Sequence, residues 1–125
     1  MPRDTNQIEA FADTDTHPRA AEVAICDGML RLIGKRENWC RGELAHQWHG
    51  VMQYCAIGAL NVASGGAPND KPWLTHNELP RARVFDRLES MTSKEGGLMM
   101  FNDRGTHRKV RALITRARAS FVAEG

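Results

Sequence analysis

The stretch Val-Met-Gln-Tyr-Cys-Ala-Ile-Gly-Ala-Leu-Asn-Val-Ala, residues 51–63, is apolar almost throughout and contains no charged residue. A helix without a polar face is usually the buried one at the centre of its domain. Gly58 weakens a helix by about 1 kcal/mol relative to Ala, so it indicates a place where a neighbouring backbone comes close. We therefore expect a central buried helix from Val51 to Ala63. The Gly-Gly-Ala-Pro sequence of residues 65–68 ends it.

Three further helices are predicted around this one. Apolar residues at helical spacing indicate an amphipathic helix of about five turns after Pro18, a second that starts near Asn77 or Pro80, and a last one from Thr106 to Ala123. The apolar run at residues 98–101 is expected to be extended or looped. The predicted fold class is mainly α, a compact four-helix bundle-like single domain over residues 18–125. A short strand near residues 98–101 is an open alternative. Residues 1–17 are polar and predict a flexible N-terminal arm.

The composition is that of a globular domain, with 42% hydrophobic and 26% charged residues in a chain of 125. Three cysteines, an odd number without a disulfide-framework spacing, favour reduced thiols in a cytoplasm. No signal peptide is visible, and the uncharged run from Val51 to Asn69 is too short and too interrupted to span a bilayer. We expect a cytoplasmic protein that does not enter a membrane. No phosphate-binding loop, nucleophile elbow or zinc-protease helix is present, so no cofactor is predicted.

A basic stretch close to the C-terminus is the first candidate binding feature. The net charge is only +2, but residues 104–118 contain six Lys or Arg and no acidic residue. Such a face is either a solvated surface or a contact for phosphates or an acidic protein. The favoured hypothesis is a non-enzymatic binding protein with a protein partner, nucleic acid being the alternative, and a monomeric or homodimeric state. The candidate contact residues are Arg104, Arg108, Lys109, Arg111, Arg116 and Trp48.

Two alternative functions depend on Cys55. A cysteine near a helix N-terminus can act as a nucleophile, with His107 as the base and Asp103 as the group that orients the base. The second alternative is a small-ligand or nucleotide-binding module with a pocket near Cys55 and Asn102-Asp103. The structural interpretation of the same residues is that Cys55 is buried in the core and that Asp103 or Thr106 caps the last helix.

A zinc site is a further alternative. Cys40, His46, His49 and Cys55 offer four soft ligands within a short stretch, as a tetrahedral zinc site requires. Their spacing matches no common zinc finger. The histidines are otherwise expected to be surface or loop residues.

The order of short motifs resembles that of a family of small uncharacterised proteins found in bacteria and their phages. In that family a Trp-x-x-Gly turn precedes a Cys-Ala-x-Gly-Ala-Leu helix, and a Trp-Asn-Asp turn precedes a Thr-capped helix. The resemblance covers about residues 20–120, although Phe101 replaces the Trp and the stretch between Gly42 and Cys55 is short. It implies a phage or mobile-element setting, in which small proteins often bind a host component such as a defence protein. The positions it nominates are Trp39, Gly42, Cys55, Gly58, Asn102, Asp103 and Thr106.

Overall fold

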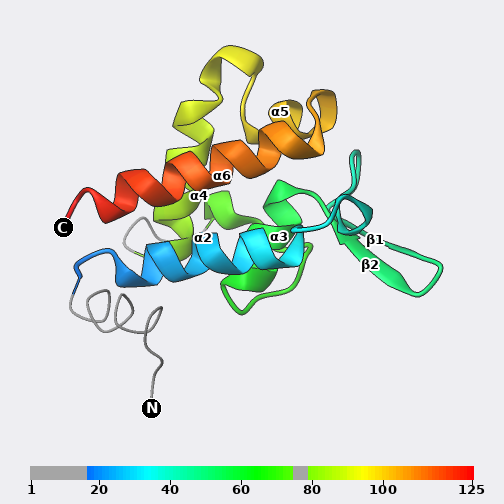
Figure 1. Ribbon diagram of the computed structural model, residues 1–125, viewed down its shortest axis with the longest axis horizontal. Coiled ribbons are helices and arrows are strands. Elements are labelled where there is room, and N and C mark those ends of the chain that lie inside the picture. Colours follow the sequence, from blue (N-terminus) through cyan, green and yellow to red (C-terminus); the bar gives the residue numbers. More distant parts are fainter. Residues whose placement is uncertain (1–16, 75–78) are drawn as a thin grey trace.

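The computed structural model describes residues 17–74 and 79–125, and Figure 1 shows them as a helical body with a hairpin at one end. The helices are α2 (Ala20–Leu32), α3 (Ala56–Ala63), α4 (Pro80–Met91), α5 (Leu98–Arg104) and α6 (His107–Val122). The strands are β1 (Ala45–Trp48) and β2 (Val51–Tyr54), which form one antiparallel sheet. Three single 3-10 turns, η1 (Arg36–Asn38), η2 (Pro72–Leu74) and η3 (Ser93–Glu95), complete the elements.

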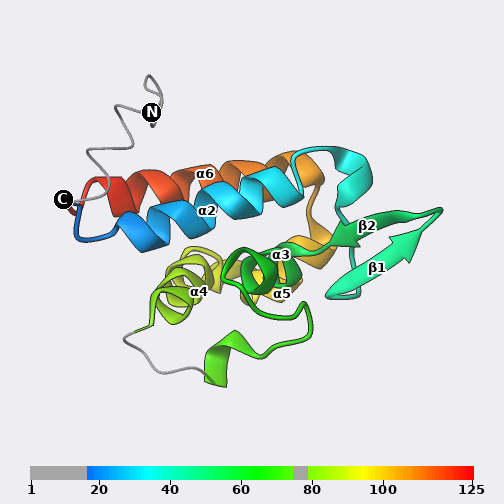
Figure 2. The ribbon, with the colours of Figure 1, turned by 90° about the horizontal axis from the view of Figure 1, so that it is seen from below.

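Two layers of helices enclose the core. Figure 2 shows α2 and α6 side by side above α3, α4 and α5. Asp27 near the middle of α2 pairs with Arg118 in the second half of α6, and Ile33 after α2 meets His107 at the start of α6. The two long helices are therefore antiparallel. Leu60 of α3 is fully buried between the layers, which confirms that this segment is central. Within the described ranges, no helix is long and apolar enough to cross a membrane.

The fold confirms a mainly α single domain but corrects the helix predicted over residues 51–63. Val51 to Tyr54 form β2, and the helix begins only at Ala56. Residues 49 and 50 join β1 to β2, and both have positive φ, 50° for His49 and 78° for Gly50. Such a two-residue turn matches the twist of an antiparallel hairpin. The uncharged run thus contains a strand followed by a helix.

The expectation that residues 98–101 are extended or looped is also wrong, and the strand left open there does not form, because these residues are the first turn of α5. The backbone N–H of Leu98 donates to Oε1 of Glu89 at 2.8 Å, so a carboxylate from α4 satisfies one of the free donors at the start of α5. Gly97, immediately before the helix, has a φ of 105°, which glycine adopts without strain. A short apolar run was too little to distinguish a strand from a helix.

The other predicted helices are confirmed with small shifts of their ends. α6 begins one residue after Thr106, whose Oγ1 accepts from the backbone N–H of Lys109 at 3.2 Å. α4 begins at Pro80, whereas α2 is shorter than the five turns predicted. Most of the predicted N-terminal arm lies outside the described residues. Its last residue, His17, hydrogen-bonds through Nε2 to the carbonyl oxygen of Val122 at 2.8 Å.

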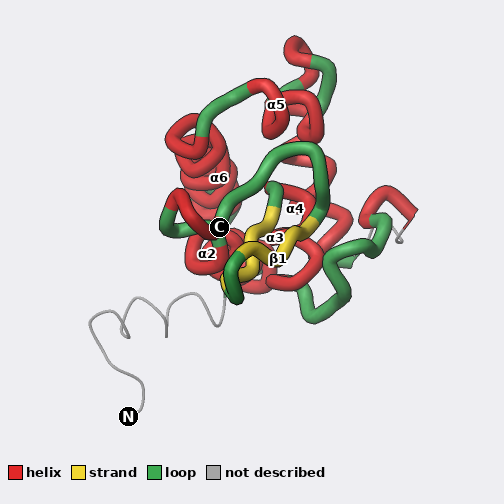
Figure 3. The backbone as a smooth tube through the Cα atoms, turned by 90° about the vertical axis from the view of Figure 1, so that its right-hand side faces the viewer, coloured by secondary structure: helices red, strands yellow, loops and turns green. Residues whose placement is uncertain are grey.

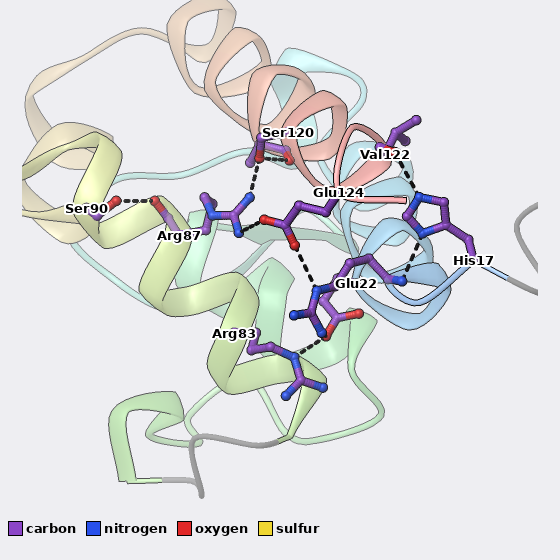
Figure 4. A network of polar contacts seen from close by, with 10 residues as sticks. His17, Glu22, Arg83, Arg87, Ser90, Ser120, Val122 and Glu124 are labelled. Carbon is purple, nitrogen blue, oxygen red and sulfur yellow. Dashed lines mark hydrogen bonds and ion pairs between the residues drawn. The ribbon is translucent and has the colours of Figure 1, made fainter.

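A polar network joins α2, α4 and the end of α6, as Figure 4 shows. Glu22 is buried, with 1% of its surface exposed, and it accepts a hydrogen bond from Arg83. Arg19 donates to Glu124 at 2.8 Å, and Arg87 donates to the other oxygen of the same carboxylate. These two arginines hold the pKa of Glu124 below its ordinary value. The network satisfies a buried charge and fixes the C-terminal turn against the helical body.

Candidate functional site

Asn102 of α5 joins three separate segments of the chain at the base of the hairpin. Its side-chain oxygen Oδ1 accepts from Nε1 of Trp39 at 2.7 Å and from the backbone N–H of Ala56 at 3.0 Å. Its amide nitrogen Nδ2 donates to the carbonyl oxygen of Cys40 at 3.1 Å. Only 1% of Asn102 is exposed. A buried amide that is bonded on both atoms fixes the relative positions of the groups it contacts.

Asp103 adds a second link between α5 and the segment before the hairpin. Its Oδ1 accepts from the backbone N–H of Gly42 at 2.9 Å and from Nδ2 of Asn102 at 3.1 Å. The turn needs glycine at position 42, where φ is 79°. Asp103 and Thr106 were the two predicted caps of the last helix. Thr106 is the cap, and Asp103 is not.

Cys55 and Gly58 complete this arrangement from the other side. Cys55 is the N-cap of α3, and its sulfur accepts from the backbone N–H of Gly58 at 3.4 Å. The backbone N–H of Cys55 donates to the carbonyl oxygen of Leu44 at 3.2 Å. A Cβ on Gly58 would lie 1.9 Å from that same oxygen, so only glycine fits. We call these contacts the hairpin junction; its residues are Trp39, Gly42, Cys55, Gly58, Asn102 and Asp103.

The structure does not assemble the predicted Cys55–His107–Asp103 catalytic set. Cys55 is 3% exposed, and burial raises the pKa of its thiol although it lies at a helix N-terminus. The Nε2 atom of His107 bonds to the carbonyl oxygen of Ile33 at 2.6 Å, and Asp103 accepts from Gly42. Across the part of the chain that the structure describes, no hydrogen bond joins any two of the three. Each of the three instead hydrogen-bonds to a backbone group.

The proposed zinc ligands are not brought together either. Among residues 17–74 and 79–125, no group of three or more His, Cys, Asp or Glu side chains is arranged to hold a metal ion. Nδ1 of His46 lies 3.3 Å from Oε1 of Glu43, and the ring of His49 contacts that of Trp48. The Cys40 thiol is half-buried, which raises its pKa to about 11.

The predicted basic residues lie on the outer side of the molecule. Arg108, Lys109, Arg111 and Arg116 are exposed on α6, and Arg104 is exposed at the end of α5. Arg118 differs, because its Nε donates to Asp27 at 2.5 Å. In the described ranges, no carboxylate forms an ion pair with the five exposed residues. We call these five residues the basic face.

Small side chains run along the middle of this surface of α6. Ala112, Thr115 and Ala119 are exposed and, at 100° per residue, lie on one strip of the helix. The same spacing puts Arg111 and Arg116 on opposite sides of the strip and Arg108 at its N-terminal end. From Ala112 to Ala119 the middle of the helix surface therefore carries short side chains, with a guanidinium on each side.

Sequence reasoning missed a groove of about 560 Å³ between the hairpin and the segment that precedes it. Figure 3 shows this end of the molecule facing the viewer. Cys55, Asn102 and Asp103, beside which a ligand pocket was predicted, do not line this groove. The residues that line it are Arg36, Glu37, Trp39, Cys40, Arg41, Glu43, His46, Trp48 and Gln53. The His-Gly pair at 49 and 50 between two uncharged runs was the available sequence signal for a hairpin here.

The chain belongs to the family of unknown function DUF6197, whose model matches residues 10–120. All the residues of the hairpin junction and Thr106 fall inside this range. No curated protein and no solved structure matches the chain.

Proposed function

We propose that this member of the family is a non-enzymatic binding protein that docks through its basic face on an anionic host macromolecule. The observation that carries the proposal is the basic face itself, five cationic side chains without a carboxylate partner in the described part of the chain. By contrast, Arg83 and Arg87 of α4 and Arg118 of α6 each pair with an acidic group. Cations left unpaired on one helix are available for an outside partner.

The shape of α6 supports the same proposal. Ala112, Thr115 and Ala119 allow a partner to approach the helix closely, and Arg111 and Arg116 can then contact it from both flanks. Like charge on the two flanks disfavours pairing of this surface with a second copy of itself. A carboxylate-rich protein surface and a phosphate backbone both satisfy guanidinium groups.

We further propose a phage or mobile-element setting, a host component such as a defence protein or its nucleic-acid complex as the partner, and the cytoplasm as the location. Three free cysteines, two of them buried, support a reducing compartment. The partner class follows from the charge of the basic face.

The test is binding of labelled probes by fluorescence anisotropy, with single-stranded and duplex DNA of about 15 nucleotides and polyglutamate as an acidic polypeptide. We expect Arg108→Glu/Arg111→Glu to weaken binding of the preferred probe at least tenfold and to reduce its salt dependence. The matched control is Lys71→Glu/Lys94→Glu, which changes the net charge equally at two exposed lysines outside α6. Equal losses for the two variants, or no binding of any probe by the unmodified protein, would refute docking through α6.

A further inference from the structure

One face of the hairpin forms a wall of the groove. β1 and β2 pair in the register that places His46 opposite Gln53 and Trp48 opposite Val51. Alternate residues of a strand point to the same face, so His46, Trp48 and Gln53 share one face, and all three line the groove. Residues 36–43 supply the facing wall. The junction described above fixes this wall to the helical body through Asn102 and Asp103.

Trp48 gives the groove an exposed aromatic platform. It lies at the end of β1 beside the His49–Gly50 turn, and 55% of it is exposed. The indole contacts the ring of His49 on one side, and its exposed surface is available for an outside ring. Trp39, which also lines the groove, is buried instead and bonds to Asn102.

Arginine and carboxylate groups share the same groove. Arg36 and Arg41 line it, together with Glu37 and Glu43. Arg41 also lies over the ring of Trp39, 5.2 Å from its centroid. A ligand that stacks on the indole can therefore contact guanidinium and carboxylate groups in the same groove.

Arg41 connects the groove with the basic face. Its Nη2 donates at 2.5 Å to the carbonyl oxygen of Gly105, the residue between Arg104 at the end of α5 and the cap of α6. Arg41, which lines the groove, therefore reaches the backbone between Arg104 and Arg108, at the N-terminal end of the basic face. A ligand that follows the basic face toward this end of α6 reaches the groove next.

These groups distinguish between two kinds of anionic ligand. An acidic peptide would satisfy Arg36 and Arg41 but would bring its carboxylates against Glu37 and Glu43. A nucleotide with an unpaired base can satisfy all of them, because its phosphate contacts guanidinium groups while the amino and imino N–H groups of the base donate to a carboxylate. Stacking on an aromatic side chain adds to this and needs a base that is out of a duplex.

We propose that the groove binds one unpaired base of a single-stranded nucleic acid, which stacks on Trp48 and donates to Glu43 or Glu37 while its backbone continues along the basic face. This inference depends on the proposed function, since it supplies the partner class for the same surface. Guanine is the preferred base, because its N1–H and N2–H groups are adjacent donors that fit one carboxylate. Thymine presents one such donor between two acceptors.

The experiment measures anisotropy of labelled oligothymidylate of about 15 nucleotides, the same strand with one central guanine, and its duplex. The full chain should bind the guanine-containing strand most tightly and the duplex most weakly. Trp48→Ala should weaken single-strand binding about tenfold, whereas Trp48→Phe, which keeps a ring, should stay within about threefold. Trp73→Ala is the matched control, since this exposed tryptophan lies on η2, outside the groove. Glu43→Gln should reduce the preference for the guanine-containing strand over oligothymidylate. Circular dichroism checks that each variant is folded.

The outcomes separate this inference from the proposed function. The inference is overturned if the Trp48→Ala variant binds as tightly as the unmodified protein, or if a duplex binds as tightly as the single strand. If Arg108→Glu/Arg111→Glu still weakens binding in that case, docking through the basic face stands alone. Binding of polyglutamate with no binding of DNA overturns the inference in favour of an acidic protein partner. If neither the α6 substitutions nor the Trp48 substitution changes binding, both proposals are refuted.

Discussion

Replacing Asn102 with alanine should destabilise the protein by more than any single surface change. The substitution removes the acceptor for Nε1 of Trp39 and for the backbone N–H of Ala56, both buried donors. A buried donor left without a partner costs about 1–3 kcal/mol, so two of them cost about 2–6 kcal/mol. The carbonyl oxygen of Cys40 loses a donor as well. A domain of this size is stable by about 5–15 kcal/mol, so the variant should fold with little stability to spare.

Urea unfolding monitored by circular dichroism measures this loss, with Asn69→Ala as the matched control at an exposed position. A double-mutant cycle then isolates the Trp39 contribution. Trp39→Phe removes the indole donor, so Asn102→Ala should cost at least about 1 kcal/mol less in that background than in the unmodified protein. A loss below about 1 kcal/mol for Asn102→Ala, or strict additivity with Trp39→Phe, would refute the role we give to this amide.

Four further predictions concern single positions. Gly58→Ala should destabilise despite the better helix propensity of alanine, because its Cβ would meet the carbonyl oxygen of Leu44; urea unfolding checks the sign. Thr106→Ala should cost about 1 kcal/mol by the same measurement and Thr106→Asp close to nothing, since an aspartate can cap α6. Cys55 should resist alkylation until the protein unfolds, because burial removes access and raises its pKa; rapid labelling of the native protein, followed by mass spectrometry, would contradict this. Glu124 has a pKa below its ordinary value of about 4.5, so its ion pairs stabilise the fold above that pH. Their contribution should disappear as the pH falls through the lowered pKa, and Glu124→Gln should flatten this part of the stability–pH curve.

The sequence predicts the long helices well because their signals are local. α6 has a capping residue at Thr106 and apolar residues at regular helical spacing, and α4 begins at Pro80. Both signals lie within the element itself. Neighbouring helices change the ends of such an element but not its type.

The hairpin and α5 could not be predicted from apolar periodicity, for a different physical reason. Each strand has only four residues, too few for an alternating pattern to stand out, and β2 runs directly into the apolar helix α3. The break between β2 and α3 at Cys55 is set by the carbonyl oxygen of Leu44, which bonds to Cys55 and excludes a side chain at Gly58. These contacts come from the fold and leave no periodic trace in the sequence.

The candidate site likewise combines residues that local sequence signals identify with contacts that only the fold creates. The motif resemblance nominated Trp39 and Asn102, but their hydrogen bond joins positions 63 residues apart, so their role could not be read from spacing. Arg41 was not nominated, although its contact with Gly105 connects the groove to α6. Arg108 and Arg111 were nominated from charge alone, and the structure places both on the exposed side of α6.

The hairpin junction and the surfaces beside it use their polar groups differently. The side chains of the hairpin junction hydrogen-bond to one another or to backbone groups. Asn102 is bonded on both of its polar atoms, and Asp103 accepts from Gly42 while Cys55 accepts from Gly58. The cations of the basic face and the indole of Trp48, by contrast, face solvent. The junction joins the segment before the hairpin to α5, so a partner that contacts both Trp48 and the basic face would span the elements that the junction connects.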